Sequence, residues 1–353
     1  MLDRPRAIAL ALLLVTLMAA AIWSSTAAGS DVSPPEAMSN AASAQPANED
    51  LVLYEAITER IAAGESYYPA AADELRRGNY PLKPFIAFRL PTLAVAGAWL
   101  GRPILLVLQW ILFAAMLTAW WFRLDGQFAD HRRRVSAVML AATGIAVAVS
   151  GHYLYLHEVW AGAFIALSLA LHRPGRWGWS LVAAAIALAI RELALPYVLL
   201  MAAIALWRRD WREAGGWAAL VLLFGIVLFW HQTAVAQAVM PSDPASPGWA
   251  AFGGWTGMLR NFHLAGPLRW LPGEVAGPII ILTLFGWASW KSATGLTATL
   301  MFLGYGLAFM LFGRANNFYW GLMVAPVFLT GLAFLPRAFS DIAASIRRGE
   351  PAS

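Results

Sequence analysis

Charged and imidazole side chains recur in this sequence at positions where the neighbouring residues are strongly apolar. A charge at the centre of a bilayer costs about 2.5–3.5 kcal/mol on insertion scales, so such a residue has a charged partner or a role in binding or proton transfer. Carboxylates and imidazoles are common general acids and bases, and arginine binds phosphate and carboxylate. The residues of this kind are Arg89, His157, Glu158, Arg191, Glu192 and His231.

Polar and aromatic residues in two further segments extend this set of candidates. Near residue 50 they are Glu49, Asp50, Tyr54, Tyr67 and Tyr68, and near residue 315 they are Arg314, Asn316 and Asn317. Purely structural roles are the alternative. Arg191 and Glu158 would then form an ion pair that joins two helical segments. His157 and Asp50 would be helix caps, the asparagines would be turn residues, and Arg314 would extend to the membrane surface.

The composition determines the class of protein to which these residues belong. Of 353 residues, 60% are hydrophobic and only 13% are charged, whereas soluble domains are nearer half apolar and a quarter charged. This excludes a soluble enzyme, a disordered chain and a fibrous protein. The net charge of +5 indicates cytoplasmic loops and anionic lipid rather than nucleic acid. The absence of cysteine excludes disulfides and thiolate chemistry.

The hydropathy pattern predicts an all-α, polytopic transmembrane bundle of about ten spans. Residues 1–28 form an N-terminal anchor, for which a cleaved signal peptide is the alternative, and residues 29–102 form an external loop. Within this loop, Asp50 caps a surface helix over 51–63 that ends at Gly64. A second surface helix follows near Pro69 and ends at Gly78. The bundle occupies 103–336, includes an external loop over 232–273, and precedes a cytoplasmic tail over 337–353.

Two segments allow more than one path through the membrane. Residues 85–101 contain Arg89 and Pro91, and they either cross the membrane or form a re-entrant or interfacial segment. The positive-inside rule favours the second reading. Residues 178–206 are interrupted by Arg191-Glu192, which favours a hairpin of short helices over 178–190 and 193–206 above one continuous helix. The other spans are predicted at about 103–122, 135–150, 158–171, 215–231, 275–290, 293–312 and 318–335.

This topology places most candidate residues on the external side. The loop over 232–273 adds an amphipathic segment in which Trp249, Phe252, Trp255, Leu259 and Phe262 follow an approximately helical spacing. Such a segment suits a lid on the bilayer, or an inert interfacial helix. There is no Walker A loop, no Rossmann glycine pattern, no H-E-x-x-H sequence and no haem motif. The cofactor is therefore unknown, and a divalent cation held by Asp50 and Glu158 remains an option.

The order of these parts resembles the GT-C class of membrane glycosyltransferases. In that class a long first external loop carries surface helices and an acidic residue, and many further spans follow. Asp31 lies nearer than Asp50 to the position at which the class usually places its acid, and members usually send the next segment across the membrane. The similar stretches are Asp50-Leu51-Val52-Leu53-Tyr54, Gly64-Glu65-Ser66-Tyr67-Tyr68, Arg89-Leu90-Pro91, His157-Glu158-Val159-Trp160-Ala161-Gly162 and Arg191-Glu192-Leu193-Ala194-Leu195-Pro196.

The resemblance implies a multi-pass enzyme of the bacterial inner membrane whose active face is periplasmic. It would transfer a sugar, with inversion, from a polyprenyl-phosphate carrier to a glycan, lipid or protein acceptor, in contact with membrane lipids. Asp50 would be the general base, and Arg191 or Arg314 would stabilise the leaving phosphate. Glu158, His157 and Glu192 would hold hydroxyl groups, and Tyr67 and Tyr68 would pack on the sugar.

Two other classes of function remain open. A transporter or lipid flippase would use the same intramembrane groups as a substrate path or a proton relay, and it predicts polar residues along the whole membrane depth. A structural or assembly subunit would use the tryptophans for packing and an Arg191–Glu158 pair as a brace.

Overall fold

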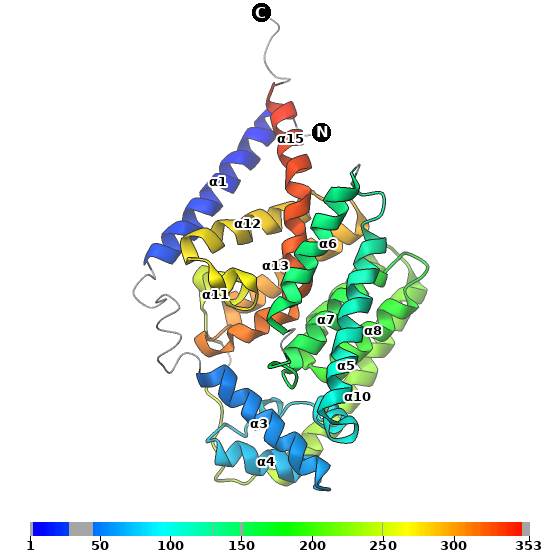
Figure 1. The fold of residues 1–353 in the computed structure, drawn as a ribbon, viewed down its shortest axis with the longest axis vertical. Helices are drawn as coiled ribbons and strands as arrows, with labels where there is room; N and C mark the ends of the chain where they lie inside the picture. The colour runs from blue at the N-terminus through cyan, green and yellow to red at the C-terminus, as the bar shows by residue number, and fades with distance from the viewer. Residues whose placement is uncertain (1–2, 28–44, 129, 149–150, 249, 348–353) are drawn as a thin grey trace, which may run out of the picture. The chain divides into compact units, whose positions relative to one another are not determined.

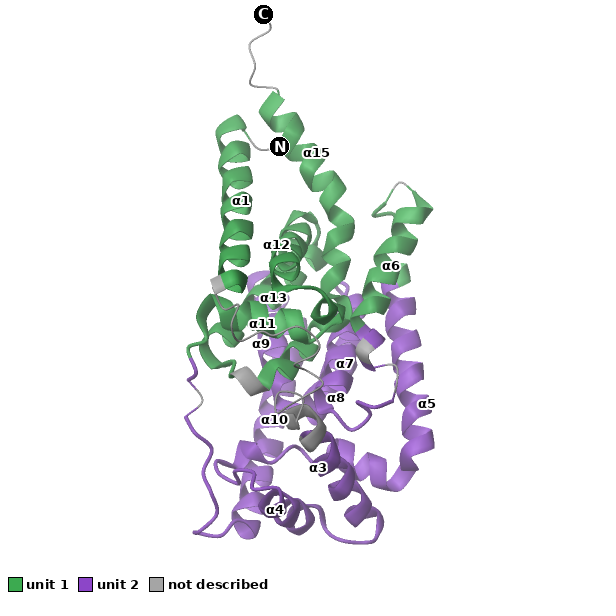
Figure 2. Ribbon diagram, turned by 60° about the vertical axis from the view of Figure 1, so that its left-hand side comes forward, with its two compact units in different colours: residues 1–38, 121–144, 252–353 green, residues 39–120, 145–251 purple. Residues whose placement is uncertain are grey.

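The computed structural model describes residues 3–27, 45–128, 130–148, 151–248 and 250–347. These ranges contain α-helices and 3₁₀-helices but no strand, and a single bridge joins Lys83 to Ala245. The predicted all-α fold is therefore confirmed. The chain divides into two compact units (Figure 2). Unit 1 comprises Met1–Met38, Trp121–Gly144 and Phe252–Ser353, and unit 2 comprises Ser39–Trp120 and Ile145–Ala251.

Unit 2 begins with the two helices predicted for the first external loop. Helix α3 ends near Gly64, which has a φ of 99° and donates its backbone N–H to Ile61 O at 2.9 Å. Glycine adopts this left-handed conformation without the steric penalty of a side chain. Helix α4 ends at Gly78, as predicted. The bounds are α3 (Gln45–Ala62) and α4 (Tyr67–Arg77).

The predicted start of the first surface helix is wrong. Helix α3 begins at Gln45 rather than after Asp50, so Asp50 lies in the second turn of the helix and is not its N-cap. Pro46 lies in the first turn of α3, where proline is tolerated because no intrahelical acceptor is available for its missing N–H.

The segment predicted to be re-entrant or spanning forms a short helix and a break. The 3₁₀-helix η1 (Phe85–Ala87) precedes α5 (Thr92–Arg123), which is interrupted at Gly101. Gly101 has φ 75° and ψ 160°, and Pro103 follows inside the helix. Because proline removes one backbone donor and clashes with the preceding turn, the two parts of α5 meet at a kink.

The remaining helices of unit 2 run back and forth between its two ends. His172 lies 2.6 Å from Glu213, and the ring of Trp177 packs on Gly216, so α8 begins beside the start of α10. Helix α9 ends at the same place because a three-residue turn joins it to α10. The bounds are α7 (His157–Leu171), α8 (Gly178–Ile190), η3 (Glu192–Ala194), α9 (Leu195–Trp207) and α10 (Trp211–Ala238).

The chain therefore enters α8 and leaves α9 at one end of unit 2, which confirms the predicted hairpin of short helices. The alternative of a continuous helix over 178–206 is wrong, because Arg191 has extended backbone angles of φ −147° and ψ 118°. The two helices of the hairpin, α8 and α9, pack on different neighbouring helices. Helix α8 packs along α7, as Figure 1 shows, and α9 packs along α10.

The loop that follows α10 is fixed to α4 by one arginine. Arg76 donates from Nε and Nη2 to the two carboxylate oxygens of Asp243, at 2.9 and 2.8 Å, and also from Nη2 to Ala238 O at 2.8 Å. The hydrogen bonds from Arg76, together with that from the Met240 backbone, hold the pKa of Asp243 at about 2. The folded state therefore binds this proton less readily than the unfolded chain does.

Unit 1 contains the N-terminal helix and most of the C-terminal third of the chain. Helix α1 buries Ala7, Leu14 and Ala21, which are spaced seven residues apart, and packs on α12, where Gly277 lies against Ala21. Small residues at this contact let the two helices approach closely. The bounds are α1 (Arg4–Ala27), α6 (His131–Ile145), α11 (Gly254–Leu264), η4 (Pro267–Trp270), α12 (Gly273–Ser289), α13 (Ala293–Phe312), η5 (Ala315–Met323), α14 (Ala325–Phe328), η6 (Leu329–Phe334) and α15 (Leu335–Arg347).

The C-terminal segment differs from the predicted span and tail. Residues 318–335 do not form one helix but the short pieces η5, α14 and η6, and residues 335–347 form α15. The reason is close packing. A Cβ placed on Gly286 would lie 1.9 Å from Gly331 O, so helix α12 and η6 meet at their backbones, and this contact fixes the local path.

The amphipathic segment predicted in the loop over 232–273 includes helix α11 of unit 1. This helix buries Met258, Leu259 and Phe262, whereas Phe252 lies before its start and is exposed. Trp249 lies outside the described residues.

Five helical segments in the described ranges are long and apolar enough to cross a membrane, rather than the ten predicted. Helices α7, α8, α9 and α12 have 15, 13, 13 and 17 residues. At 1.5 Å per residue they reach roughly 20–26 Å, which is less than the hydrocarbon thickness of about 30 Å. The five segments are Arg4–Thr26, Phe85–Arg123, Trp211–Ala238, Ala293–Phe312 and Ala325–Arg347.

Candidate functional site

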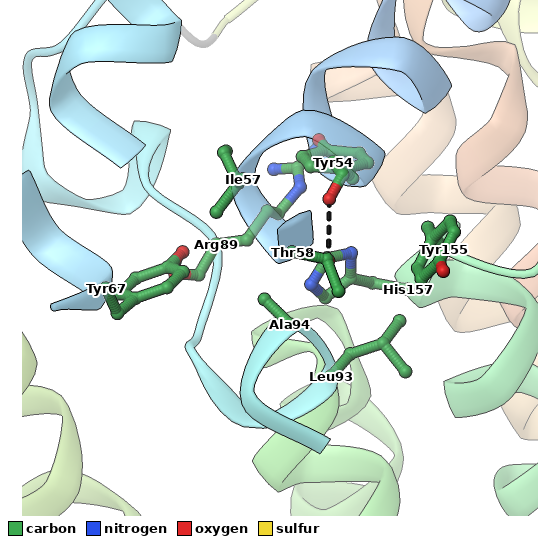
Figure 3. Close-up of a pocket in the computed structure, with 9 residues that line it drawn as sticks. All are labelled: Tyr54, Ile57, Thr58, Tyr67, Arg89, Leu93, Ala94, Tyr155 and His157. Atoms are coloured by element: carbon green, nitrogen blue, oxygen red, sulfur yellow. Dashed lines mark hydrogen bonds between the residues drawn. The ribbon is translucent and has the colours of Figure 1, made fainter. Parts of the chain in front are cut away.

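A pocket in unit 2 is lined by residues from α3, α4, α5, the start of α7 and the segments that precede α5 and α7 (Figure 3). The guanidinium of Arg89 lies over the ring of Tyr54, with Cζ 5.7 Å from the ring centroid. The ring of His157 meets Tyr54 edge-on, with the centroids 5.0 Å apart. The free volume is about 10 Å³, which is room for about one water molecule. The lining residues are Tyr54, Ile57, Thr58, Tyr67, Arg89, Leu93, Ala94, Tyr155 and His157.

Beside this pocket lies a buried cluster of four charged residues. Arg191 donates from Nε to Glu158 Oε1 at 2.7 Å and from Nη1 to Glu192 Oε1. Arg89 Nη2 lies 3.8 Å from the same oxygen of Glu158. The side chain of Glu158 is fully buried and that of Arg191 is 1% exposed, whereas the Glu192 side chain is 20% exposed. The ion pair between Arg191 and Glu158, which the structural alternative predicts, is therefore present.

The helix ends explain why these residues occupy these positions. Glu158 lies in the first turn of α7, where unsatisfied N–H groups favour a negative charge. Arg191 is the C-cap of α8, where carbonyl oxygens favour a positive charge. The extended backbone at Arg191 interrupts the apolar run and turns this side chain toward Glu158. Because α7 and α8 are antiparallel neighbours, the pair joins their adjacent ends.

Several buried polar atoms at the site have no hydrogen-bond partner of normal geometry in the described residues. Both ring nitrogens of His157 and Oε2 of Glu158 belong to this group. The backbone of Leu90 lies near the imidazole but outside hydrogen-bonding geometry. An unsatisfied buried polar group costs about 1–3 kcal/mol, so these atoms are the natural contacts for water or for a ligand hydroxyl group.

Two tyrosines link the pocket to the end of α10. Tyr67 donates its hydroxyl to Arg89 O at 2.7 Å, and burial raises its pKa above the usual range, which keeps the phenol protonated. Tyr68 meets Tyr67 edge-on, and its hydroxyl lies 3.1 Å from His231 Nδ1. The predicted residues Tyr54, Tyr67, Tyr68, Arg89, His157 and His231 are thus connected.

A partly exposed ion pair lies at the pocket edge near Tyr155. Arg102, which follows the break in α5, lies 3.3 Å from Glu55 on α3. Both side chains are about half exposed. Burial raises the pKa of Tyr155, which lines the pocket. Sequence reasoning missed Tyr155, Thr58 and Arg102, and the position of Arg102 between Gly101 and Pro103 was the available signal.

The other predicted site residues are not in the pocket lining. Asp50 is buried on α3, four residues before Tyr54, so the two share one face of the helix one turn apart. The side chain of Glu49 and the whole of Asp31 lie outside the described residues. Arg314 and Asn317 belong to unit 1, where Asn317 lies within η5.

Buried polar contacts also occur farther along α7. The Ser168 hydroxyl lies 2.9 Å from both the Ser180 hydroxyl and the Tyr197 hydroxyl. At the end of the helix, His172 Nε2 lies 2.6 Å from Glu213 Oε1. These contacts were not predicted, because serine and tyrosine in an apolar helix give no distinctive sequence signal.

Comparison with known families and metal-site patterns adds no assignment to this geometry. No protein-family model, curated protein or solved structure matches this chain. In the described ranges, no three His, Cys, Asp or Glu side chains form a group able to hold a metal ion. Asp50 and Glu158 belong to no such group, so the suggested cation between them has no support in the described ranges.

Proposed function

We propose that this protein is a multi-pass membrane transferase of GT-C type that moves a sugar from a polyprenyl-phosphate carrier to an acceptor hydroxyl. The observation that carries the proposal is the position of Arg89 beside aromatic side chains of the pocket, near the start of apolar helices. An arginine over Tyr54 and beside Tyr67 and His157 offers a cation for phosphate and polar and aromatic surfaces for a sugar. The adjacent apolar helices suit the lipid chain. We place this pocket at the periplasmic face of a bacterial inner membrane.

The different contacts of Arg89 and Arg191 support this role for Arg89. Arg191 is committed to Glu158 and Glu192 through direct hydrogen bonds. Arg89 approaches Glu158 only to 3.8 Å and lines the pocket itself. Its guanidinium is therefore the nearer group for the negative charge that develops on a leaving phosphate, and Arg191 positions Glu158.

In the proposed reaction, the acceptor oxygen forms a bond to the anomeric carbon while the bond to the lipid phosphate breaks. The electron pair of that bond leaves with the phosphate, and attack from the opposite side inverts the configuration. The acceptor proton passes to the carboxylate of Asp50, which lies one turn from Tyr54 on α3. The unsatisfied nitrogens of His157 hold a hydroxyl group of the acceptor or the sugar. The other proposed contacts, all within unit 2, are Glu49, Tyr68, Glu192 and His231.

The size of the pocket sets a further requirement. Space for about one water molecule does not admit a sugar, so α3 must separate from α5 and α7 for the donor to enter. One polar contact between α3 and α5 at the pocket edge is the partly exposed Glu55–Arg102 pair. Exposed ion pairs contribute only about 0–1 kcal/mol, so breaking this pair adds little to the cost of separating the buried faces of the helices.

The test is transfer from radiolabelled polyprenyl-phosphate sugars to crude membrane acceptors by the purified full-length protein. Asp50→Asn is expected to lower transfer about 10²–10⁴-fold, the usual contribution of a general base, and Arg89→Met is expected to abolish the preference for phosphate-linked donors. Glu59→Gln on the exposed face of α3 and Arg77→Met on α4 are the matched controls. Wild-type levels of transfer in Asp50→Asn would remove Asp50 from the mechanism.

A transporter or lipid flippase is the second candidate, and one observation favours it. Polar groups follow α7 along its length, from Glu158 through Ser168 to His172, instead of lying only at one end. Such a series is what a path for a polar headgroup or a proton requires. The hydroxyl groups of Ser168, Ser180 and Tyr197 also form hydrogen bonds with one another. This arrangement is equally consistent with a role in helix packing alone.

The two candidates differ in proteoliposomes that contain a fluorescent lipid. A flippase moves the lipid between leaflets without any sugar donor, and Ser168→Ala with Tyr197→Phe slows this movement. If the protein is a transferase, neither the wild type nor the double variant changes the rate at which the lipid moves between leaflets. A structural or assembly subunit would show neither activity in isolation.

A further inference from the structure

One end of unit 2 gathers five arginines, which we name the arginine end. It comprises the loop between α7 and α8 and the turn between α9 and α10. These segments lie together because His172 contacts Glu213 and Trp177 packs on Gly216. The five arginines are Arg173, Arg176, Arg208, Arg209 and Arg212.

None of these arginine side chains makes an ion pair or a hydrogen bond with the described residues. The two acidic residues nearby are already engaged. Asp210 Oδ1 accepts the Glu213 backbone N–H at 3.1 Å, and Glu213 Oε1 contacts His172 and Trp217. Nη1 of Arg208 is buried without a partner. By contrast, arginines on α3 and α4, such as Arg60 and Arg76, are each bound to carboxylates.

Three tryptophans at the same end are strongly exposed. The exposed fractions are 76% for Trp179, 72% for Trp207 and 69% for Trp211. Trp179 lies in the first turn of α8, Trp207 ends α9 and Trp211 begins α10. Indole rings favour the boundary between lipid headgroups and hydrocarbon, so these rings mark the depth at which the arginines meet the membrane surface.

We propose that the arginine end binds the headgroups of anionic phospholipids in the leaflet it faces. The unpaired guanidinium groups supply the charge that phosphate headgroups complement, and the tryptophans supply the apolar contact with the acyl-chain region. A nucleic acid or an acidic protein segment would meet the arginines but would leave the indole rings in water. A lipid surface satisfies both sets of side chains at once.

The test is native mass spectrometry of the full-length protein in neutral detergent, with phosphatidylglycerol or phosphatidylcholine added. The wild type is expected to retain phosphatidylglycerol in preference to phosphatidylcholine. Arg209→Gln with Arg212→Gln is expected to weaken phosphatidylglycerol binding about fivefold for each arginine, because a basic residue near an anionic surface contributes about that factor. The charge-preserving pair Arg209→Lys with Arg212→Lys is expected to retain binding.

The matched control is Arg132→Gln with Arg133→Gln, which removes the same charge from two exposed positions at the start of α6. Each variant is accepted only if its thermal unfolding in detergent matches the wild type. Equal weakening in both glutamine variants would overturn the proposal, because it would show a diffuse effect of net charge. Absence of any preference for phosphatidylglycerol in the wild type would overturn it as well. These outcomes do not depend on transferase activity.

Discussion

Removing the carboxylate of Glu158 is the most informative change to the buried charge cluster. In Glu158→Gln the side-chain shape is retained, but Arg191 loses its 2.7 Å partner and Arg89 loses its nearest carboxylate. Arg191 then keeps only its hydrogen bond to Glu192 among the carboxylates of the described residues. Breaking a buried ion pair by removing one partner costs about 3–5 kcal/mol, because the remaining charge stays buried without compensation.

The structure predicts a smaller loss of stability for Glu192→Gln than for Glu158→Gln. Glu192→Gln removes one hydrogen bond to Arg191, but the Glu192 side chain is 20% exposed and Glu158 stays in place. The expected loss is about 1.5–3 kcal/mol, the range for a hydrogen bond to a charged group. In the double variant Glu158→Gln with Arg191→Met both charges of the direct pair are absent. Its loss is expected to fall short of the sum of the single losses by about 0.5–3 kcal/mol.

The assay is unfolding in mixed micelles of neutral detergent and dodecyl sulfate, followed by far-UV circular dichroism. The wild type, Glu158→Gln, Glu192→Gln, Arg191→Met and the double variant of Glu158→Gln with Arg191→Met are compared under the same conditions. A Glu158→Gln midpoint equal to that of the wild type would refute the reasoning, because it would show that the pair contributes nothing. Strict additivity in the double variant would refute the direct coupling between Glu158 and Arg191.

Three further predictions follow from other contacts. The depressed pKa of Asp243 stabilises the loop after α10 above the unfolded carboxyl pKa of about 3.9, and this protection is lost as the pH falls toward about 2. Pepsin should therefore cut Asp243→Asn faster than the wild type near pH 4, and the difference should vanish near pH 2; a constant difference would contradict this. Gly286→Ala should lower stability by at least about 1–3 kcal/mol through overpacking against Gly331, while Gly304→Ala, which meets no atom within 4 Å, should raise it by up to about 1 kcal/mol; equal thermal shifts would refute the close backbone contact. Arg102→Gln should speed labelling of a cysteine introduced at Thr58, by releasing the Glu55–Arg102 contact at the pocket edge, and an unchanged labelling rate would show that this pair does not limit access.

The sequence was sufficient to predict the helical class and several local features. Glycine at 64 and 78 marks helix ends, and the Arg191-Glu192 pair inside an apolar run marks a break, because charge and backbone freedom act locally. It also offered the pairing of Arg191 with Glu158 as one alternative, since opposite charges within apolar segments stabilise each other. Contacts that depend on three-dimensional packing were not predictable in the same way.

The number of spans is the clearest example of this limit. Hydropathy alone does not distinguish a 13-residue apolar helix such as α8, whose ends are fixed by Trp177 and Arg191, from part of a longer span. The start of α3 was misplaced because a Pro-Ala-Asn sequence suits either a linker or a first helical turn. Thr58, Tyr155 and His157 line one pocket because separate segments pack together, and no periodic pattern in the sequence reveals that packing.

The central claim is that the pocket of Tyr54, Tyr67, Arg89 and His157 receives the phosphate end of a lipid-linked sugar. The most direct measurement is photo-crosslinking of the purified full-length protein with a polyprenyl-phosphate sugar that carries a photoreactive group beside the phosphate. Peptide mapping is expected to place the label on α3, on the start of α5 or on the start of α7, with loss in Arg89→Met and competition by unlabelled polyprenyl phosphate. Labelling confined to other segments, or unaffected by Arg89→Met, would contradict the account.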